Sequence, residues 1–439
     1  MDSRWQLVLG TLGEEDAPFG QGSLVRFRER MVAHDLDRKL VDRTVALAKA
    51  SGAFGWQKLK AALDSSPLLG AGRVEDTWNL LGRAIRRVVD AVCVATGREF
   101  ESVVDDAQLD LLDGPSLKAA LDINWDEPGE RNQALTRLVD QAVALQRWVI
   151  DNVREQAERP PVSTELELLE ALIAQDIEPD PSDPSGTRVR IRQGTAKDRI
   201  PSVGDPEMRH GRKSRSKKFV GYKRHVASVP GANLIVGAEV LPANVPEHRA
   251  VPRLVEDVGR HGDLQTVAVD RGYLHVEAVD FLSERGIDVE CKPWRSSNRQ
   301  RFSKDEFDID LEARQVSCPA GQTATYLMSA STRRGTARFN ADTCNRCELK
   351  AQCTASKLGR TVSIHALEPL FVRLREMKAT PAGRDVLRER VDVEHALARV
   401  GRIQGPKARY RGARKNTLDV RRAAAINNLQ TIQRLRQAA

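Results

Sequence analysis

The sequence predicts an α/β fold that carries two insertions, one helical and one rich in cysteine. Residues 219–294 alternate between short apolar runs and helical patterns, which is typical of a sheet with connecting helices. Residues 77–175 are almost wholly helical in pattern and contain two long periodic segments without internal proline. Residues 295–366 are rich in turns and hold four of the six cysteines.

Composition limits the classes of function that fit the chain. With 439 residues, the chain is long enough for two or three domains. The net charge of +8, from 69 basic and 61 acidic residues, suggests a polyanionic partner that binds at basic patches. No apolar run approaches the length of a membrane span, and the first residues lack a secretory signal, so we expect a cytoplasmic protein without membrane contact.

The segments that flank the helical insertion have their own patterns. Residues 24–50 predict packed helix, with an apolar stripe formed by Leu24, Phe27, Met31, Leu36, Leu40, Val41 and Val45. Residues 178–216 begin with proline and aspartate and predict a linker or long loop. This segment ends in a basic run without any acid, which is either a solvated tail or a phosphate-binding loop.

Two groups of basic residues are candidates for contact with DNA phosphates. The first precedes and enters the strand FVGYKRHVASV, and it comprises Arg212, Lys213, Lys217, Lys218 and Lys223. The second follows the helix that ends near Ile403, and it comprises Lys407, Arg409, Arg411, Arg414 and Lys415, with Tyr410 among them. A basic loop held at the edge of a sheet is well placed to bind phosphates.

Glu394 is the first candidate for a functional acid. Thr380 and Pro381 predict the start of a helix that runs to Ile403. Glu394 falls on the helical face formed by Leu387, Val391, Leu397 and Ala398, which we expect to point inward. An ionised carboxylate there needs a cation to compensate its charge. That cation is either Arg390, one turn earlier, or a bound metal.

Two aspartates are the other candidate acids. Asp270 ends the apolar run LQTVAV, and ligands of open α/β sheets bind at such strand ends; alternatively, Asp270 only caps the next helix. Asp64 follows the short segment KLKAAL, which fits either a strand or a helix end. The alternative is that Asp64 is only a turn or cap residue. Asp76, a rival acid, fits better as a helix cap.

The cysteine-rich insertion predicts a structural metal site. Cys318 lies upstream of Cys344, Cys347 and Cys353, and a pair of cysteines in a CxxC turn is typical of zinc ribbons. Four thiolates leave no open coordination position, so we expect one Zn²⁺ that stabilises the insertion and performs no chemistry. His365 is a less favoured ligand.

The motifs LDSSPL, HGRKSRSKKFVGYKRHV, VAVDRGY and RVDVEHALARVGRIQG, together with the four cysteines, resemble the DDE transposases of bacterial insertion sequences, specifically the IS1182-like group, related to IS4 and IS5. This resemblance implies an RNase H-like mixed sheet. It places Asp64 on the first strand, Asp270 after the fourth and Glu394 on the helix after the fifth. Arg390 and Arg271 are assigned supporting roles. Leu387 departs from the tyrosine of the family's pattern.

The resemblance implies metal-dependent DNA cleavage and strand transfer at insertion-sequence ends. Asp64, Asp270 and Glu394 would bind two Mg²⁺ or Mn²⁺ ions, for which carboxylates are suitable ligands. The expected partner is double-stranded DNA, bound by a homodimer in the bacterial nucleoid. A nuclease of the same fold, and a decayed transposase that only binds DNA and zinc, are the alternatives.

The expected domain boundaries follow from these patterns and from the resemblance. Residues 1–52 form an N-terminal helical segment, which we expect to be a truncated DNA-binding domain because the family carries further helices before this point. Residues 53–74, 216–294 and 367–439 form the catalytic core. The insertions are a helical one at 75–176 and a zinc-binding one at 295–366, and residues 177–215 are a linker with a basic end.

Overall fold

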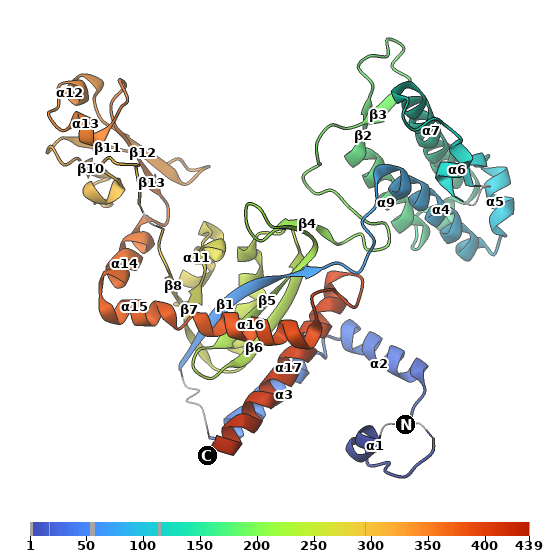
Figure 1. The fold of residues 1–439 in the computed structure, drawn as a ribbon, viewed down its shortest axis with the longest axis horizontal. Helices are drawn as coiled ribbons and strands as arrows, with labels where there is room; N and C mark the ends of the chain where they lie inside the picture. The colour runs from blue at the N-terminus through green and yellow to red at the C-terminus, as the bar shows by residue number, and fades with distance from the viewer. Residues whose placement is uncertain (1–2, 17, 53–57, 113–115, 295, 439) are drawn as a thin grey trace.

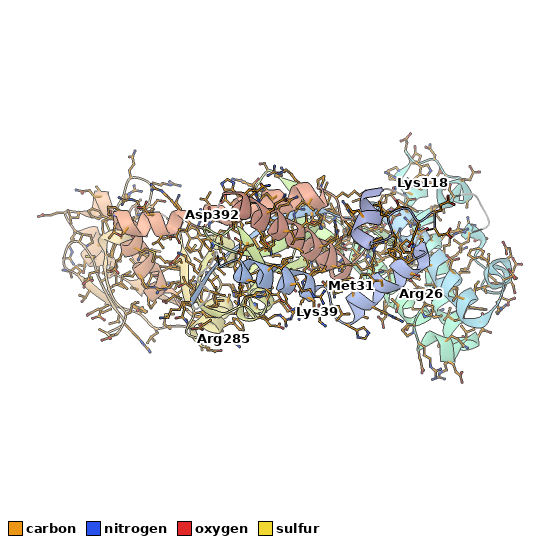
Figure 2. The ribbon with its side chains drawn as sticks, turned by 90° about the horizontal axis from the view of Figure 1, so that it is seen from below. Arg26, Met31, Lys39, Lys118, Arg285 and Asp392 are labelled. Atoms are coloured by element: carbon orange, nitrogen blue, oxygen red, sulfur yellow. The ribbon has the colours of Figure 1, made fainter. Side chains whose placement is uncertain are left out.

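The computed structural model describes residues 3–16, 18–52, 58–112, 116–294 and 296–438. A central body contains the main sheet, and two insertions leave it on opposite sides (Figure 1). Seen from below, the parts follow one another along the long axis, with Lys118 in the helical insertion and Arg285 and Asp392 in the central body (Figure 2). In the part of the chain that the structure describes, no helix is long and apolar enough to cross a membrane.

The main sheet is mixed, with parallel and antiparallel neighbours. Its six strands are β1 (Lys58–Leu69), β4 (Arg209–Arg212), β5 (Lys218–Val229), β6 (Leu234–Pro242), β7 (Asp263–Val269) and β8 (Asp288–Cys291). The order is β4-β5-β1-β7-β8, and β6 also pairs with β5. Strands β1, β7 and β8 are parallel, whereas β5 is antiparallel to β1, β4 and β6. Ala61, Ala62 and Leu63 of β1 are fully buried, as expected for a central strand covered on both faces.

Helices connect the strands and cover the sheet. The short turn η2 (Glu247–Ala250) and α10 (Val251–Gly259) join β6 to β7, and η3 (Arg271–Tyr273) and α11 (Val276–Ser283) join β7 to β8. After β8 the chain enters the cysteine-rich insertion. It returns through four helices: α14 (Glu368–Ala379), α15 (Pro381–Arg388), α16 (Val391–Gln404) and α17 (Ala413–Ala438). Helix α16 packs on β1 and β5, and α17 packs on β6.

Side chains of α17 satisfy backbone groups of β6. The amide of Asn428 bonds both the N–H and the C=O of Ile235, each at 2.8 Å. The hydroxyl of Thr417 accepts from the N–H of Val240 at 3.1 Å. A strand edge covered in this way does not pair with other chains, so the sheet ends at β6 along this stretch.

The N-terminal segment forms α1 (Ser3–Leu9), α2 (Gln21–Ala33) and α3 (Arg38–Ala50). The prediction of helix over residues 24–50 is correct except at 34–37, where Asp35 adopts a positive φ of 51°. The predicted stripe is only partly buried. Met31, Val41 and Val45 are buried, but Leu24 and Phe27 of α2 are 37% and 58% exposed.

The helical insertion follows β1 and precedes β4 in the sequence, and it has its own hydrophobic core. Its helices are α4 (Thr77–Thr96), α5 (Phe100–Asp106), η1 (Asp110–Leu112), α6 (Leu117–Leu121), α7 (Pro128–Asn152), α8 (Arg154–Ala157) and α9 (Val162–Asp176). The three long helices match the three that the sequence predicts. Asp76 caps α4 by accepting from the N–H of Asn79 at 2.8 Å, as expected.

The segment predicted as a linker is more ordered than its composition suggests. It contains the hairpin β2 (Ile177–Pro179) and β3 (Val189–Ile191), as well as β4. Val203 is fully buried in the core of the helical insertion. The description as a linker or long loop is therefore wrong for these parts, because buried contacts outweigh the polar, proline-rich composition.

The cysteine-rich insertion consists of two small antiparallel sheets and short helices. One sheet contains β9 (Asp308–Asp310), β10 (Gln315–Ser317) and β11 (Thr323–Thr325), and the other contains β12 (Arg334–Arg338) and β13 (Thr361–His365). The helical turns are η4 (Lys304–Glu306), α12 (Ala341–Asn345) and α13 (Lys350–Cys353). Residues 53–57 and 295, which fall at two expected domain boundaries, lie outside the described residues.

Candidate active site

Asp64 lies within β1, so the strand alternative is correct. Its side chain is 15% exposed, and its Oδ1 accepts from the N–H of Ser65 at 2.8 Å. Burial raises the pKa of Asp64 to about 6, and the negative charges of Asp270 and Glu394 act in the same direction. The Ser65 N–H and the cation of Arg390 oppose this increase. Asp64 is therefore a buried carboxylate whose ionised form needs a cation.

Asp270 follows β7 directly and lies level with Asp64. In the parallel register of β1 and β7, Ala62 is opposite Ala268, and each aspartate comes two residues later. The Oδ1 of Asp270 accepts from the N–H of Gly272 at 2.8 Å and so caps η3. The sequence allowed Asp270 to be either a cap or a residue of a ligand site. In the structure it caps the next turn and also borders the cleft beside Asp64.

The inward face predicted around Glu394 is wrong. Thr380 caps the helix as expected, but the helix ends at Arg388, and α16 starts again at Val391. Between them, Glu389 pairs with Lys60 of β1 at 2.8 Å. The buried face of α16 contains Val393, Ala396, Leu397, Val400 and Gln404, whereas Val391 and Ala398 are exposed.

Glu394 lies in the first turn of α16, and its side chain is 51% exposed. It nevertheless borders the same cleft as Asp64 and Asp270. Arg390 joins two of these acids, since its Nη2 is 2.7 Å from Glu394 Oε1 and its Nη1 is 3.4 Å from Asp64 Oδ2. Arg271 differs from this, because it is exposed and its guanidinium lies over the ring of Trp294.

The cleft is polar and has a volume of about 630 Å³. Its acids lie next to basic residues from β4, β5 and α16, namely Arg212, Lys213, Lys223, Arg224 and Arg402. Three of these are among the basic residues selected from the sequence. Lys217 and Lys218 are exposed on the β4–β5 hairpin, and Lys407, Arg409, Arg411 and Lys415 are exposed near the start of α17, where Tyr410 is half-buried.

Arg414 has a structural environment that the sequence did not reveal. Its guanidinium pairs with Asp35 and Asp37, at 3.1 and 2.5 Å, and donates to the carbonyl of Val32. Asp37 is fully buried and also pairs with Arg421 at 3.0 Å. These contacts attach the turn between α2 and α3 to α17, so the assignment of Arg414 as a DNA contact is not supported by its surroundings.

Glu247 is a cleft residue that the sequence analysis missed. It is the first residue of η2, and its Oε1 accepts from the hydroxyl of Ser65 at 2.6 Å. An acid in the first turn of a helix is common for local electrostatic reasons, so no pattern around Glu247 indicates a role in the cleft.

The four cysteines of the insertion line one cavity, together with Phe302 and Phe339. No three of their sulfur atoms lie within 4.8 Å of one another. His365 does not border this cavity; its Nδ1 accepts from the N–H of Leu367 at 3.1 Å. The arrangement brings the four predicted ligands together around one space but not at metal-bound spacing.

His248, His275 and Glu277 form a separate group whose ligand atoms lie within 4.8 Å of one another. The two imidazole rings stack with centroids 4.0 Å apart. Burial and the neighbouring His275 lower the pKa of His248, so its ring is neutral, the form that binds metals. The sequence analysis did not identify this group, because its residues come from η2 and the start of α11.

Residues 317–433 match the family model for a transposase DDE domain. The match includes the four cysteines, Arg390 and Glu394, whereas Asp64 and Asp270 precede it. No curated protein matches the chain. No solved structure matches it either. Over these residues the chain is therefore similar to a transposase DDE domain, a family whose members act on DNA and use divalent metals.

Proposed function

We propose that this chain is a transposase of the IS1182-like group that cleaves DNA at insertion-sequence ends and transfers the strands to a target. The observation that carries the proposal is the convergence of Asp64, Asp270 and Glu394 on one cleft with basic residues around it. Acids alone would repel DNA, and basic residues alone would only bind it. The combination fits phosphoryl transfer on a DNA backbone.

The strand arrangement supports an RNase H-like catalytic core. Three parallel strands, β1, β7 and β8, adjoin an antiparallel pair formed by β5 and β6. If the edge strand β4 is left out of the count, Asp64 is on the first of these strands and Asp270 follows the fourth. Glu394 lies on a helix that follows the fifth core strand after the cysteine-rich insertion, which agrees with the order that the resemblance implies.

The donor set fits Mg²⁺ or Mn²⁺, since it consists of carboxylate oxygens, the hard ligands that these ions prefer. Asp64, Asp270 and Glu394 would hold the ions. When bound, two divalent ions supply Lewis-acid activation of a water or a DNA 3′-hydroxyl and stabilise the leaving oxygen. The protein's own contribution is positional: β1 and η3 hold the two aspartates, and the first turn of α16 presents Glu394 to the same cleft.

The basic residues around the cleft would bind the DNA backbone. Arg212 and Lys213 border the cleft, and Lys217 and Lys218 extend the same hairpin into solvent. Phosphate contacts of this kind position the duplex without reading its sequence. We further propose that a homodimer binds two DNA ends in the bacterial nucleoid.

The cysteine-rich insertion would bind one structural Zn²⁺ through Cys318, Cys344, Cys347 and Cys353. The support is their common cavity and the hydrophobic core around it. Small sheets such as β12 and β13 bury little apolar surface, so a bound metal would contribute a large share of the stability of this part.

Incubation of the purified chain with plasmid DNA that carries candidate terminal repeats tests the proposed function. We expect nicking at the repeat ends and joined products, both dependent on Mg²⁺ or Mn²⁺. Nicking without joined products indicates a nuclease of the same fold. Salt-dependent binding with no metal-dependent nicking contradicts the enzymatic proposal and leaves a zinc-containing DNA-binding protein.

A further inference from the structure

We propose that Glu247 is a fourth carboxylate of the divalent metal site, acting with Asp64, Asp270 and Glu394. This inference rests on the proposed function and adds a ligand to it. Glu247 is placed for this role by its position, since η2 follows β6 after a short turn and Glu247 borders the same cleft as Asp64 of β1 and Asp270 after β7. Its side chain is 22% exposed, so the carboxylate is largely withdrawn from solvent.

Ser65 joins Glu247 to Asp64. Its backbone N–H donates to Asp64 Oδ1 at 2.8 Å, and its hydroxyl donates to Glu247 Oε1 at 2.6 Å. One residue of β1 therefore holds one oxygen of each carboxylate. The second oxygen of Asp64, Oδ2, accepts from Arg390 Nη1 at 3.4 Å.

Gly272 shows where the second oxygen of Glu247 points. A Cβ built on Gly272 would lie 1.8 Å from Glu247 Oε2 and 3.1 Å from Asp270 Oδ1. Both distances start from the same point, so the separation of Glu247 Oε2 and Asp270 Oδ1 cannot exceed their sum. The backbone of Gly272 is not in the left-handed region, so a side chain is excluded here by the Glu247 carboxylate and not by conformation.

Basic residues line the cleft as a whole, but the immediate surroundings of its four carboxylates favour a cation. Among the described residues, Arg390 and Lys223 are the cations within 4.0 Å of the four carboxylates, and Lys223 is 3.9 Å from Glu247. Lys223 also donates to the carbonyl of Val245 at 3.2 Å. Within ion-pair distance, four acids therefore have two cationic partners, which leaves negative charge at the carboxylates themselves. Glu247 and Asp270 would hold a divalent ion together with Asp64 and Glu394, and the ion would neutralise that charge.

Mn²⁺ binding to the full chain, freed of Mg²⁺ and Mn²⁺ but keeping its zinc, tests this proposal without using activity when it is measured by paramagnetic resonance and calorimetry. Glu247→Gln keeps the acceptor for Ser65 but removes the charge, and we expect at least about tenfold weaker Mn²⁺ binding. Glu284→Gln, at an exposed acid beyond α11, is the matched control and should bind Mn²⁺ as the wild type does. Thermal unfolding in chelator shows that each variant is folded.

Two further variants separate a ligand from a residue that only positions Ser65. Ser65→Ala removes the hydrogen bond and leaves the carboxylate, so we expect a smaller loss of affinity than for Glu247→Gln. Gly272→Ala introduces a methyl group where Glu247 Oε2 lies, and we expect weaker binding with no change in charge. Equal losses for Ser65→Ala and Glu247→Gln would overturn the proposal.

Asp270→Asn is the reference that separates this inference from the proposed function. Normal Mn²⁺ binding by Glu247→Gln with weakened binding by Asp270→Asn overturns the role of Glu247 and leaves the proposed function intact. Normal binding by both variants contradicts the metal site itself. If Glu247→Gln unfolds early in chelator, Gly272→Ala decides, because it displaces the carboxylate while retaining the charge.

Discussion

Arg390 donates to Glu394 with Nη2 2.7 Å from Oε1, one helical turn away, while its other terminal nitrogen lies 3.4 Å from Asp64. The guanidinium thus connects a helix to the central strand through two acids that are 330 residues apart in sequence. Arg390 is a counter-ion of the metal-free site. Its positive charge neutralises the same two carboxylates that a bound divalent ion would neutralise.

Replacement of this counter-ion should tighten metal binding. We expect Arg390→Met to raise the Mn²⁺ affinity of the stripped protein by about tenfold, because a cation a few ångströms from the site repels the ion by about 1–2 kcal/mol. Calorimetric titration measures the change. Arg388→Met is the control, since Arg388 is exposed and pairs with Asp385 at 2.6 Å. Weaker Mn²⁺ binding by Arg390→Met would show that the guanidinium organises the site instead of competing with the metal.

The two groups of arginine and lysine residues should separate into DNA contacts and structural ion pairs. Lys217→Ala with Lys218→Ala should weaken DNA binding and lower the slope of log K against log salt by about 2, because two phosphate contacts are lost. Binding titrations at several salt concentrations measure this slope. An unchanged slope would assign both lysines to solvent.

Arg414→Ala should act on stability. We expect a loss of about 3 kcal/mol in the free energy of unfolding, since the buried Asp37 loses one of its two arginine partners. Chemical denaturation measures the loss, and Arg411→Ala, at an exposed arginine nearby, is the control. Equal stability of the two variants would show that the contact with Asp37 contributes little.

Removal of the CxxC pair should release zinc and unfold the insertion. The double variant Cys344→Ser, Cys347→Ser should lose one Zn²⁺ per chain and become sensitive to proteolysis within residues 318–353 before the core does. Elemental analysis and limited proteolysis provide the readouts. Cys93→Ser, which lies in the helical insertion, should keep its zinc. A wild-type chain without zinc would contradict the assignment.

The raised pKa of Asp64 predicts how stability depends on pH. Its folded-state pKa of about 6 exceeds the ordinary 3.8, so this group's contribution to stability is complete below pH 4 and is lost as the pH rises through 6. The loss amounts to at most about 3 kcal/mol. In chelator, Asp64→Asn should therefore gain stability relative to the wild type between pH 4 and 7. A difference that does not vary with pH would contradict the burial of an ionisable group here.

Much of the fold follows from local patterns in the sequence. The apolar run before Asp270 forms β7, and the basic segment leads into β5 as expected. The long helices α4, α7 and α9 follow from their periodicity. Such elements are predictable because a buried strand or an amphipathic helix repeats its pattern over many residues.

The candidate site was less predictable, because it depends on contacts between distant segments. The sequence predicts one continuous helix from Thr380 to Ile403. In the structure this helix is broken at residues 389 and 390, and the buried face of the second part does not include Glu394. In the sequence, Arg414 belongs to a basic group that predicts a DNA contact. The structure shows that its side chain pairs with Asp37, which is distant in sequence. Glu247 has no sequence motif, and its role becomes visible only beside Gly272.

The rate of Mg²⁺-dependent DNA nicking by Asp270→Asn and Glu394→Gln, with thermal unfolding of the same samples, tests the central claim most directly. Both changes keep the shape of the side chain and remove the charge that holds the metal. We predict a loss of several orders of magnitude in rate, since each 1.4 kcal/mol or so of lost transition-state stabilisation is tenfold, with near-normal DNA affinity and melting temperature. Variants that fold normally and nick DNA at the wild-type rate would contradict the assignment of these carboxylates to the active site.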